Sequence, residues 1–319
     1  MHLSEGILPL RWAGLWYAVA APFVVKGVVD VNKKAETNPY FKPLLGLMAA
    51  AVFIISCMPV PVPTAGTCSH PCGTGMSAIL VGPMMSILIT SIALFMQALF
   101  LAHGGITTWG ADIVSMGIAG SFTGYIVFKT LRRLKASLFL SGFVAGLLAD
   151  WATYAATSFE LASALHGNKP LGPLFMTILI AFIPTQLPLG ILEGFLTGGM
   201  IVFVAKRRPD ILASLGIIKA GSRMFIFLLV FFALLTNKNF VFAKDNQTKW
   251  GGVDESVVEK VAEEHGRKAW EPFINTDQGD LLLFVFLLAG TVGGFILGYN
   301  FRKLFIEKDD LRDAKRSIQ

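Results

Sequence analysis

The 319-residue sequence has little charge and few cysteines for its length. Charged residues make up 15% of it and hydrophobic residues 54%, with a mean hydropathy of +0.63, whereas soluble domains carry about 25% charged residues. So few ionisable groups cannot cover a water-facing surface, which excludes a soluble enzyme or a nucleic-acid-binding protein despite a net charge of +6. Three cysteines (Cys57, Cys68 and Cys72) are too few for a disulfide scaffold. The composition predicts a polytopic membrane protein.

Several motifs of energy conversion and catalysis are also missing. The sequence contains no G-x-x-x-x-G-K-[ST] phosphate loop, so the chain does not hydrolyse ATP by itself. It contains neither the H-E-x-x-H metalloprotease motif nor a G-x-S-x-G nucleophile elbow. If the protein moves a substrate against a gradient, the energy comes from a partner or from an ion gradient.

Long apolar runs dominate what is present, and a membrane span needs about 20 such residues. The runs cover residues 10–29, 43–60, 84–102, 111–131, 138–158, 171–205, 223–242 and 281–301, with a shorter run at 74–82. The 171–205 run exceeds one span and contains Pro184 and Pro188, so it is tilted, broken or made of two pieces. The predicted fold is an all-α membrane protein, a helical bundle of about nine membrane segments.

Basic residues cluster between these runs. Nineteen of the 27 Lys and Arg residues lie within residues 26–42, 129–135, 206–223 and 302–316. The positive-inside rule places these segments in the cytoplasm. The 74–82 run must then cross as a short segment, which puts the N-terminus outside the cell; without that crossing the N-terminus is cytoplasmic. Residues 1–9 contain no basic residue, so no cleavable signal is expected and Met1 is retained.

A polar, basic stretch, residues 206–222, separates the chain into two parts. We expect a metal-binding transmembrane domain of residues 1–210, a cytoplasmic linker of residues 211–222, and a C-terminal part of residues 223–319 with two spans and a cytoplasmic tail. The loop between those spans, residues 243–279, holds eight acidic and five basic residues, which suits a location outside the cell. Within it, Ser256 and Glu259 form a capping-box pattern that predicts a short amphipathic helix ending at Gly266.

His2 is a candidate metal ligand because of its place in the chain. The α-amine of Met1, the amide nitrogen of His2 and its imidazole can close fused chelate rings on one ion. A further imidazole would complete a square-planar site of four nitrogens, a geometry that selects Ni(II), Cu(II) or low-spin Co(II). The alternative is that His2 is simply the second residue of a frayed terminus.

A second candidate is the loop of residues 63–75, which is rich in Gly, Thr and Pro and lies between apolar spans. Such a loop must be buried in protein or line a polar cavity. His70 offers an imidazole, and Cys68 and Cys72 offer thiolates that favour softer ions. The C-x-H-x-C spacing matches no common zinc pattern, so the cysteines either tune the site or only pack.

Three more residues stand out. His103 lies in the glycine-rich stretch 102–112, where it either orients a ligand or belongs to a tight turn. Asp150 and Glu193 fall within or at the edge of apolar spans, where ionisable groups are rare and often functional. Asp150 next to Trp151 can also mark an interface, and Glu193 can hold a broken helix together.

Taken together, these residues resemble the CbiM/NikM family, the substrate-capture (S) components of energy-coupling factor transporters for cobalt and nickel. The likeness covers residues 1 to about 210 and is carried by residues 1–8, 67–75, 78–83, 97–99, 103–111 and 193–194. It implies a seven-helix unit with Ni(II) or Co(II) as transported ligand and no cofactor. The implied metal ligands are Met1, His2 and His70, with His103, Cys68 and Cys72 beside them.

Residues 223–303 look like the small CbiN/NikN component, through residues 250–254, 270–273 and 281–284. The chain would then be a fusion of the two components in the cell membrane. The resemblance implies as partners a transmembrane coupling (T/Q-type) protein and ATP-binding-cassette (ABC) ATPase subunits on other chains, within membrane lipid.

Two other functions were weighed against metal capture. One is a metal-dependent intramembrane enzyme that uses His70, Cys68 and Cys72, although no candidate general base adjoins His70 in sequence. The other is a vitamin-type S component, which the chelating N-terminus disfavours. The sequence does not distinguish nickel from cobalt, since both ions accept nitrogen ligands.

Overall fold

The computed structural model describes residues 2–62, 67–217, 252–276, 278 and 280–307. Its long helices are α1 (Leu10–Thr37), α2 (Phe41–Cys57), α4 (Pro83–Phe100), α6 (Ser121–Arg133), α7 (Leu138–Leu165), α8 (Leu171–Arg207) and α12 (Asp280–Phe301). Shorter elements are α3 (Thr74–Val81), α5 (Trp109–Asp112), η1 (Ile113–Gly120), α9 (Pro209–Ser214), η2 (Asp254–Glu259), α11 (Lys260–Glu264) and η3 (Arg302–Ile306), of which the three η segments are π-helical. Strands β1 (Val60–Val62) and β2 (Thr67–Ser69) pair antiparallel, with Val60 opposite Ser69.

The predicted all-α membrane class is confirmed. Six helical segments among the described residues are long and apolar enough to cross a membrane, and α2 is a shorter apolar helix. They match the apolar runs to within a few residues, except that α1 and α7 extend further. The run at 223–242 lies outside the described residues, so the total of about nine membrane segments stays a prediction.

The short run at 74–82 forms α3, a buried helix of eight residues. At 1.5 Å per residue it is about 12 Å long, less than half of a bilayer core. The Lys34 ammonium, near the C-terminal end of α1, donates to the carbonyl of Val81 at 3.5 Å. Towards the other end of the bundle, the side-chain amide of Gln97 in α4 donates to the hydroxyl of Ser56, near the C-terminal end of α2. The chain therefore changes ends between β2 and Gly82, as the parity of the basic clusters requires.

Helix α8 is continuous over 37 residues although it contains Pro184 and Pro188, so it is not two pieces. Its neighbour α7 packs closely along it. A Cβ on Gly142 would lie 2.9 Å from the Gly198 Cα, and one on Gly146 would lie 2.7 Å from the Glu193 carbonyl oxygen. Small residues allow this close approach of two backbones, and the tight pair holds the long helix together.

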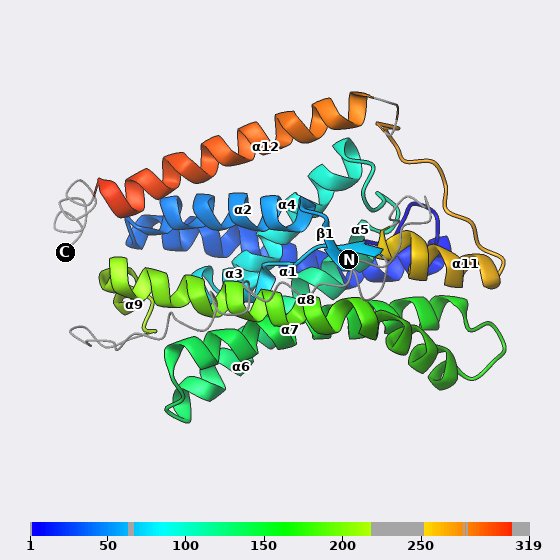
Figure 1. Cartoon of the computed structure of the whole chain (residues 1–319), viewed down its shortest axis with the longest axis horizontal. Coiled ribbons are helices and arrows are strands. Elements are labelled where there is room, and N and C mark those ends of the chain that lie inside the picture. The colour runs from blue at the N-terminus through cyan, green and yellow to red at the C-terminus, as the bar shows by residue number, and fades with distance from the viewer. Residues whose placement is uncertain (1, 63–66, 218–251, 277, 279, 308–319) are drawn as a thin grey trace, which may run out of the picture.

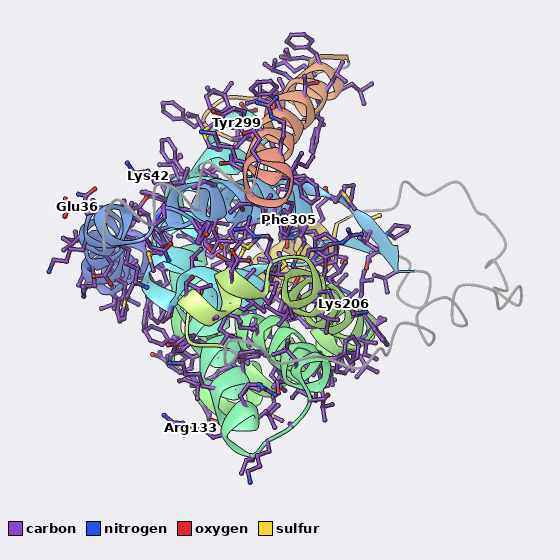
Figure 2. The ribbon with its side chains drawn as sticks, turned by 90° about the vertical axis from the view of Figure 1, so that its left-hand side faces the viewer. Glu36, Lys42, Arg133, Lys206, Tyr299 and Phe305 are labelled. Atoms are coloured by element: carbon purple, nitrogen blue, oxygen red, sulfur yellow. The ribbon has the colours of Figure 1, made fainter. Side chains whose placement is uncertain are left out.

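The two ends of the bundle differ in charge and in structure. Lys42, Arg133 and Lys206, one from each of three predicted cytoplasmic clusters, lie at the end that Figure 2 views. The opposite end carries β1, α5 and α11 (Figure 1). We call it the hairpin end, after the hairpin formed by β1 and β2.

The predicted helix of the acidic loop is present, but it begins at Asp254 in η2 and continues through α11. The chain leaves it through Gly266, which adopts a left-handed φ of +76°. Its apolar face packs against the start of the chain, because Val258 and Ala262 share a buried cluster with Leu3 and Ile7. This packing places the C-terminal segment 252–276 over the N-terminal residues.

Candidate metal centre

The N-terminal residues 2–8 form a buried loop rather than a frayed end. The backbone N–H of Leu3 donates to the Asp112 carboxylate at 2.8 Å, and the Thr108 hydroxyl donates to the Leu3 carbonyl at 2.5 Å. The side chain of Leu3 is itself fully buried. These bonds to both the N–H and the carbonyl of Leu3 fix the backbone that directly follows His2.

Glu5 ties the same loop to the glycine-rich stretch that carries His103. Its carboxylate accepts from the backbone N–H groups of Ile106 at 2.5 Å and Thr107 at 3.0 Å. The Thr107 hydroxyl in turn accepts from the N–H of Gly6 at 3.0 Å. The two segments are therefore held in one register, which brings His103 beside His2.

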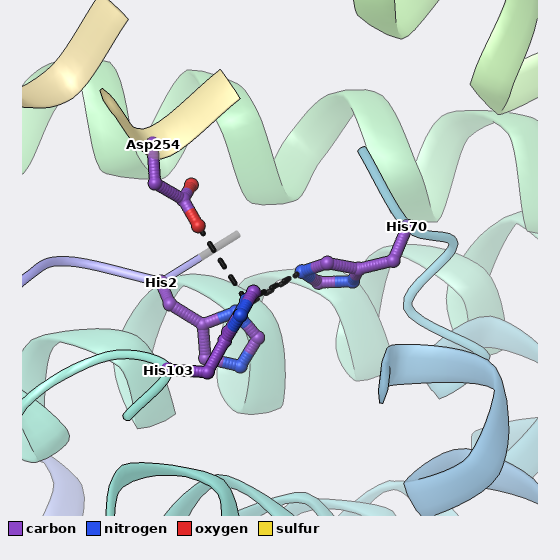
Figure 3. Close-up of side chains that lie close together, drawn as sticks. All are labelled: His2, His70, His103 and Asp254. Atoms are coloured by element: carbon purple, nitrogen blue, oxygen red, sulfur yellow. Dashed lines mark hydrogen bonds and ion pairs between the residues drawn. The ribbon is translucent and has the colours of Figure 1, made fainter. Parts of the chain in front are cut away.

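Three imidazoles converge at this point (Figure 3). Nε2 of His70 lies 3.0 Å from Nδ1 of His2 and 3.3 Å from Nε2 of His103. The ring centroids of His2 and His103 are 4.1 Å apart, edge to face. His2 and His70 are buried, whereas about a third of the His103 side chain is exposed. The sequence predicted all three residues at the site, and the structure brings them together.

These distances suit one metal ion. Two nitrogens bound at right angles, each about 2.0–2.1 Å from an ion, lie about 2.9 Å apart, close to the 3.0 Å between His2 and His70. Nδ1 is also the His2 nitrogen that closes a six-membered chelate ring with the His2 amide nitrogen. Met1, whose amine would close the next ring, lies outside the described residues.

Burial keeps the three imidazoles in the neutral form that binds metal. It disfavours the charged imidazolium, and so it lowers the pKa of His2 and of His70 well below the usual 6.5. The pKa of His103 falls for the same reason, to about 4. All three rings are therefore neutral at physiological pH and keep a lone pair for an ion.

Asp254, at the start of η2, is a fourth group at the site. Its carboxylate lies 3.5 Å from Nε2 of His103, and ligand atoms of Asp254 and the three histidines all lie within 4.8 Å of one another. Burial raises the pKa of this carboxyl to about 6. Sequence reasoning missed Asp254, because it is one of eight acidic residues in its loop. Its only signal was its place in the stretch 250–254.

The two loop cysteines have different surroundings. Cys68 lines a cavity of about 100 Å³ together with His70, His103 and Asp254, and it forms an isolated parallel bridge with Gly252. Cys72 is fully buried and points instead to Asp150 and Glu193. Of these two loop cysteines, only Cys68 lies beside the imidazoles; Cys57, at the end of α2, lines the same cavity.

The segment 252–276 is fastened over the N-terminal loop by polar bonds as well as by packing. The Arg267 guanidinium donates to three successive carbonyls, those of Gly6 at 2.6 Å, Ile7 at 3.1 Å and Leu8 at 3.1 Å. The backbone N–H of Trp270 donates to the Glu5 carbonyl at 2.8 Å. A Cβ at Gly6, which has a φ of +73°, would lie 2.3 Å from the Trp270 ring, so only glycine fits there.

A membrane-embedded helical bundle with convergent neutral imidazoles at one end is the architecture of a membrane protein that handles a transition-metal ion. Comparison with known families agrees with this class. Residues 2–211 match the CbiM family, described as "Cobalt uptake substrate-specific transmembrane region". The chain belongs to that family.

Named relatives extend the match. A cobalt transport protein CbiM from Geobacter sulfurreducens is 60% identical over 314 residues, covering 97% of this chain and 91% of the relative. A CbiM from Sorangium cellulosum is 56% identical over 219 residues, which are 69% of this chain and 97% of that protein. The first alignment therefore includes the C-terminal part, whereas the second relative is shorter.

Two solved structures share the fold. A truncated transition metal transporter superposes with a TM-score of 0.56 at 26% identity, covering 65% of this chain and 99% of that one. A second transition metal transporter gives a TM-score of 0.55 at 27% identity, with 65% and 93% covered. The relatives are transport proteins, so this chain is a multi-pass membrane transport component and not the metal-dependent enzyme weighed as an alternative.

Proposed function

We propose that this chain captures Ni(II) or Co(II) for uptake into the cell. The observation that carries the proposal is the convergence of His2, His70 and His103 in a largely buried, neutral group with ligand spacing. In the proposed site, the Met1 amine, the His2 amide nitrogen, His2 Nδ1 and His70 Nε2 would bind the ion in a plane, and the amide N–H of His2 would give up its proton to water. His103 lies against this plane, and its carboxylate partner Asp254 adds negative charge that favours a cation.

The energy for uptake would come from other chains. The sequence lacks a phosphate loop, and the family resemblance implies an energy-coupling factor transporter in which a transmembrane coupling (T/Q-type) protein and ABC ATPase subunits drive release. In this proposal the end that carries Lys42, Arg133 and Lys206 faces the cytoplasm and meets those partners. The N-terminus and the hairpin end face the outside.

The C-terminal part has a defined role in the same proposal. Residues 223–319 would be the fused CbiN/NikN-like component, separated from the capture domain by the linker 211–222. Its outside segment 252–276 covers residues 2–8 through Arg267 and Trp270 and brings Asp254 to His103. Opening and closing of this segment would admit and then enclose the ion.

The proposed planar ligand set would favour nickel slightly over cobalt. A planar set of four nitrogens suits d⁸ Ni(II) best, and the general order of affinity also places nickel above cobalt. The cellular supply of each ion decides which one is carried.

The geometry of bound nickel tests this function. We expect the purified full-length chain to bind its tightest Ni(II) in a square-planar, diamagnetic form, because four strong in-plane nitrogens pair the d⁸ electrons. Magnetic susceptibility and visible absorption during a nickel titration measure this directly. Tight binding that gives only paramagnetic, octahedral Ni(II), or binding no tighter than that of Mn(II), would contradict the proposal.

A further inference from the structure

A second group of metal-ligating side chains lies apart from the three histidines. Cys72 comes from the loop before α3, Asp150 from α7 and Glu193 from α8. One ligand atom from each lies within 4.8 Å of the other two. All three residues are at most 1% exposed, so the group is enclosed by protein in the interior of the bundle.

Glu193 has a structural role that explains its own position. Its carboxylate accepts from the backbone N–H of Cys72 at 2.7 Å and from that of Gly73 at 2.9 Å. One carboxylate oxygen serves each donor, so the loop that carries His70 is pinned to α8. These bonds leave further lone pairs on both oxygens, because a carboxylate accepts about four hydrogen bonds.

Asp150 has no such explanation. Its side chain is fully buried, and neither of its carboxylate oxygens has a hydrogen-bond partner among the described residues. Within that same part of the chain, no Lys or Arg forms an ion pair with Asp150 or Glu193. A buried, unpaired carboxylate next to a second one is costly. Something must balance it, either a proton or a cation.

The position of the group relates it to the histidines. The Ser69 hydroxyl, next to His70, contacts the Tyr154 hydroxyl at 3.2 Å and accepts from the Gln186 amide at 3.2 Å. Asp150 lies one helical turn from Tyr154 along α7, and Glu193 lies two turns from Gln186 along α8. Asp150 therefore lies about 6 Å further from the hairpin end than Tyr154 along α7, and Glu193 lies about 10 Å further from it than Gln186 along α8.

We infer that Cys72, Asp150 and Glu193 form a second transition-metal site, one step further into the bundle than the histidine site. A thiolate with two carboxylates selects Co(II), Ni(II) or Zn(II) over Mg(II) and Ca(II), because magnesium and calcium prefer oxygen ligands alone. Tetrahedral ligands on one such ion lie about 3.3–3.8 Å apart, so an inward turn of the side chains by roughly 1 Å closes the site. Binding displaces the thiol proton to water.

The role of this site in transport rests on the proposed function, whereas its capacity to bind metal does not. Cys72 is two residues from His70 on one loop, so the ion would pass from the imidazoles to the thiolate and carboxylates as it moves inward. The histidine site would capture the ion, and the second site would hold it on the path to release.

Cobalt absorption separates the two sites. We expect purified full-length protein loaded with Co(II) to show a thiolate-to-cobalt charge-transfer band in the near ultraviolet. The band should persist in His70→Ala, vanish in Cys72→Ser, and remain in Cys57→Ser and Cys68→Ser, since these two cysteines lie outside the group. Asp150→Asn keeps the shape of the side chain but removes its charge, and it should weaken the Co(II) affinity read from the band by at least about tenfold.

Several outcomes would overturn the inference. The second site is wrong if wild-type protein shows no charge-transfer band, if the band follows Cys57 or Cys68, or if it disappears with His70. An unchanged affinity in Asp150→Asn would show that Asp150 is balanced by a proton and is not a ligand. Failure of the capture function is a separate result, because it concerns the nickel geometry at the histidines and leaves this band in place.

Discussion

Replacing His70 with alanine is expected to weaken the tightest Ni(II) binding by at least about 100-fold. Substituting a group that only hydrogen-bonds to a metal ligand already weakens metal affinity about 10–100-fold, and His70 is proposed as a ligand itself. Its Nε2 lies at the cis-ligand distance of 3.0 Å from His2 Nδ1, and the ring is buried, so water cannot easily replace it with the same geometry. Competition with a chelator of known affinity measures the change.

Matched substitutions show whether the loss belongs to the site. His166 lies at the turn between α7 and α8, where its ring bonds the Lys169 carbonyl, so His166→Ala should leave nickel affinity unchanged. The nickel affinity of His103→Ala should lie between those of His70→Ala and His166→Ala, because the His103 ring contacts His2 and His70 without belonging to the proposed plane. Equal affinity in His70→Ala and wild type would remove His70 from the ligand set.

Arg267→Ala is expected to speed the release of bound metal by about tenfold or more. Arg267 holds the segment 252–276 on the carbonyls of Gly6, Ile7 and Leu8. A hydrogen bond to a charged group contributes about 1.5–3 kcal/mol, so losing the guanidinium favours the open arrangement in which Asp254 leaves the site. Stopped-flow transfer of Ni(II) to a chelator measures the rate.

Two controls accompany this rate. Arg267→Lys keeps the charge but cannot bond three carbonyls with a fixed fork, so it should give an intermediate rate. Arg207→Ala removes an exposed arginine at the other end of the bundle and should release metal at the wild-type rate. If Arg267→Ala also releases metal at that rate, the segment 252–276 does not enclose the ion.

The helices were predictable because a membrane imposes a simple rule on the sequence. Apolar length and the grouping of basic residues gave most spans to within a few residues, and charge parity anticipated the short buried helix α3. The continuity of α8 was not decided by its sequence, since Pro184 and Pro188 favour a break. Close packing against the glycines of α7 supports the continuous helix. Such packing depends on how α7 and α8 meet, and the sequence of α8 alone does not show it.

The candidate site was predictable where chemistry and sequence position coincide. The residues alone left two interpretations of His2, a chelator or the second residue of a frayed terminus, and the family resemblance favoured the chelator. His70 and His103 lie in polar loops that must face a cavity or pack. Asp254 was not predictable, because it approaches His103 across about 150 residues of chain. Asp150 and Glu193 stood out in their spans, but their meeting with Cys72 depends on the register of α7 against α8.

The central claim is that the amine of Met1 belongs to the metal site, and an N-terminally extended protein tests it most directly. A short polar extension before Met1 keeps His2 and His70 but converts the free amine into an amide. Titration of native and extended proteins with Ni(II) and Co(II) should show tight square-planar binding only in the native form. Equal binding by both forms would contradict the chelate and place the ion on side chains alone.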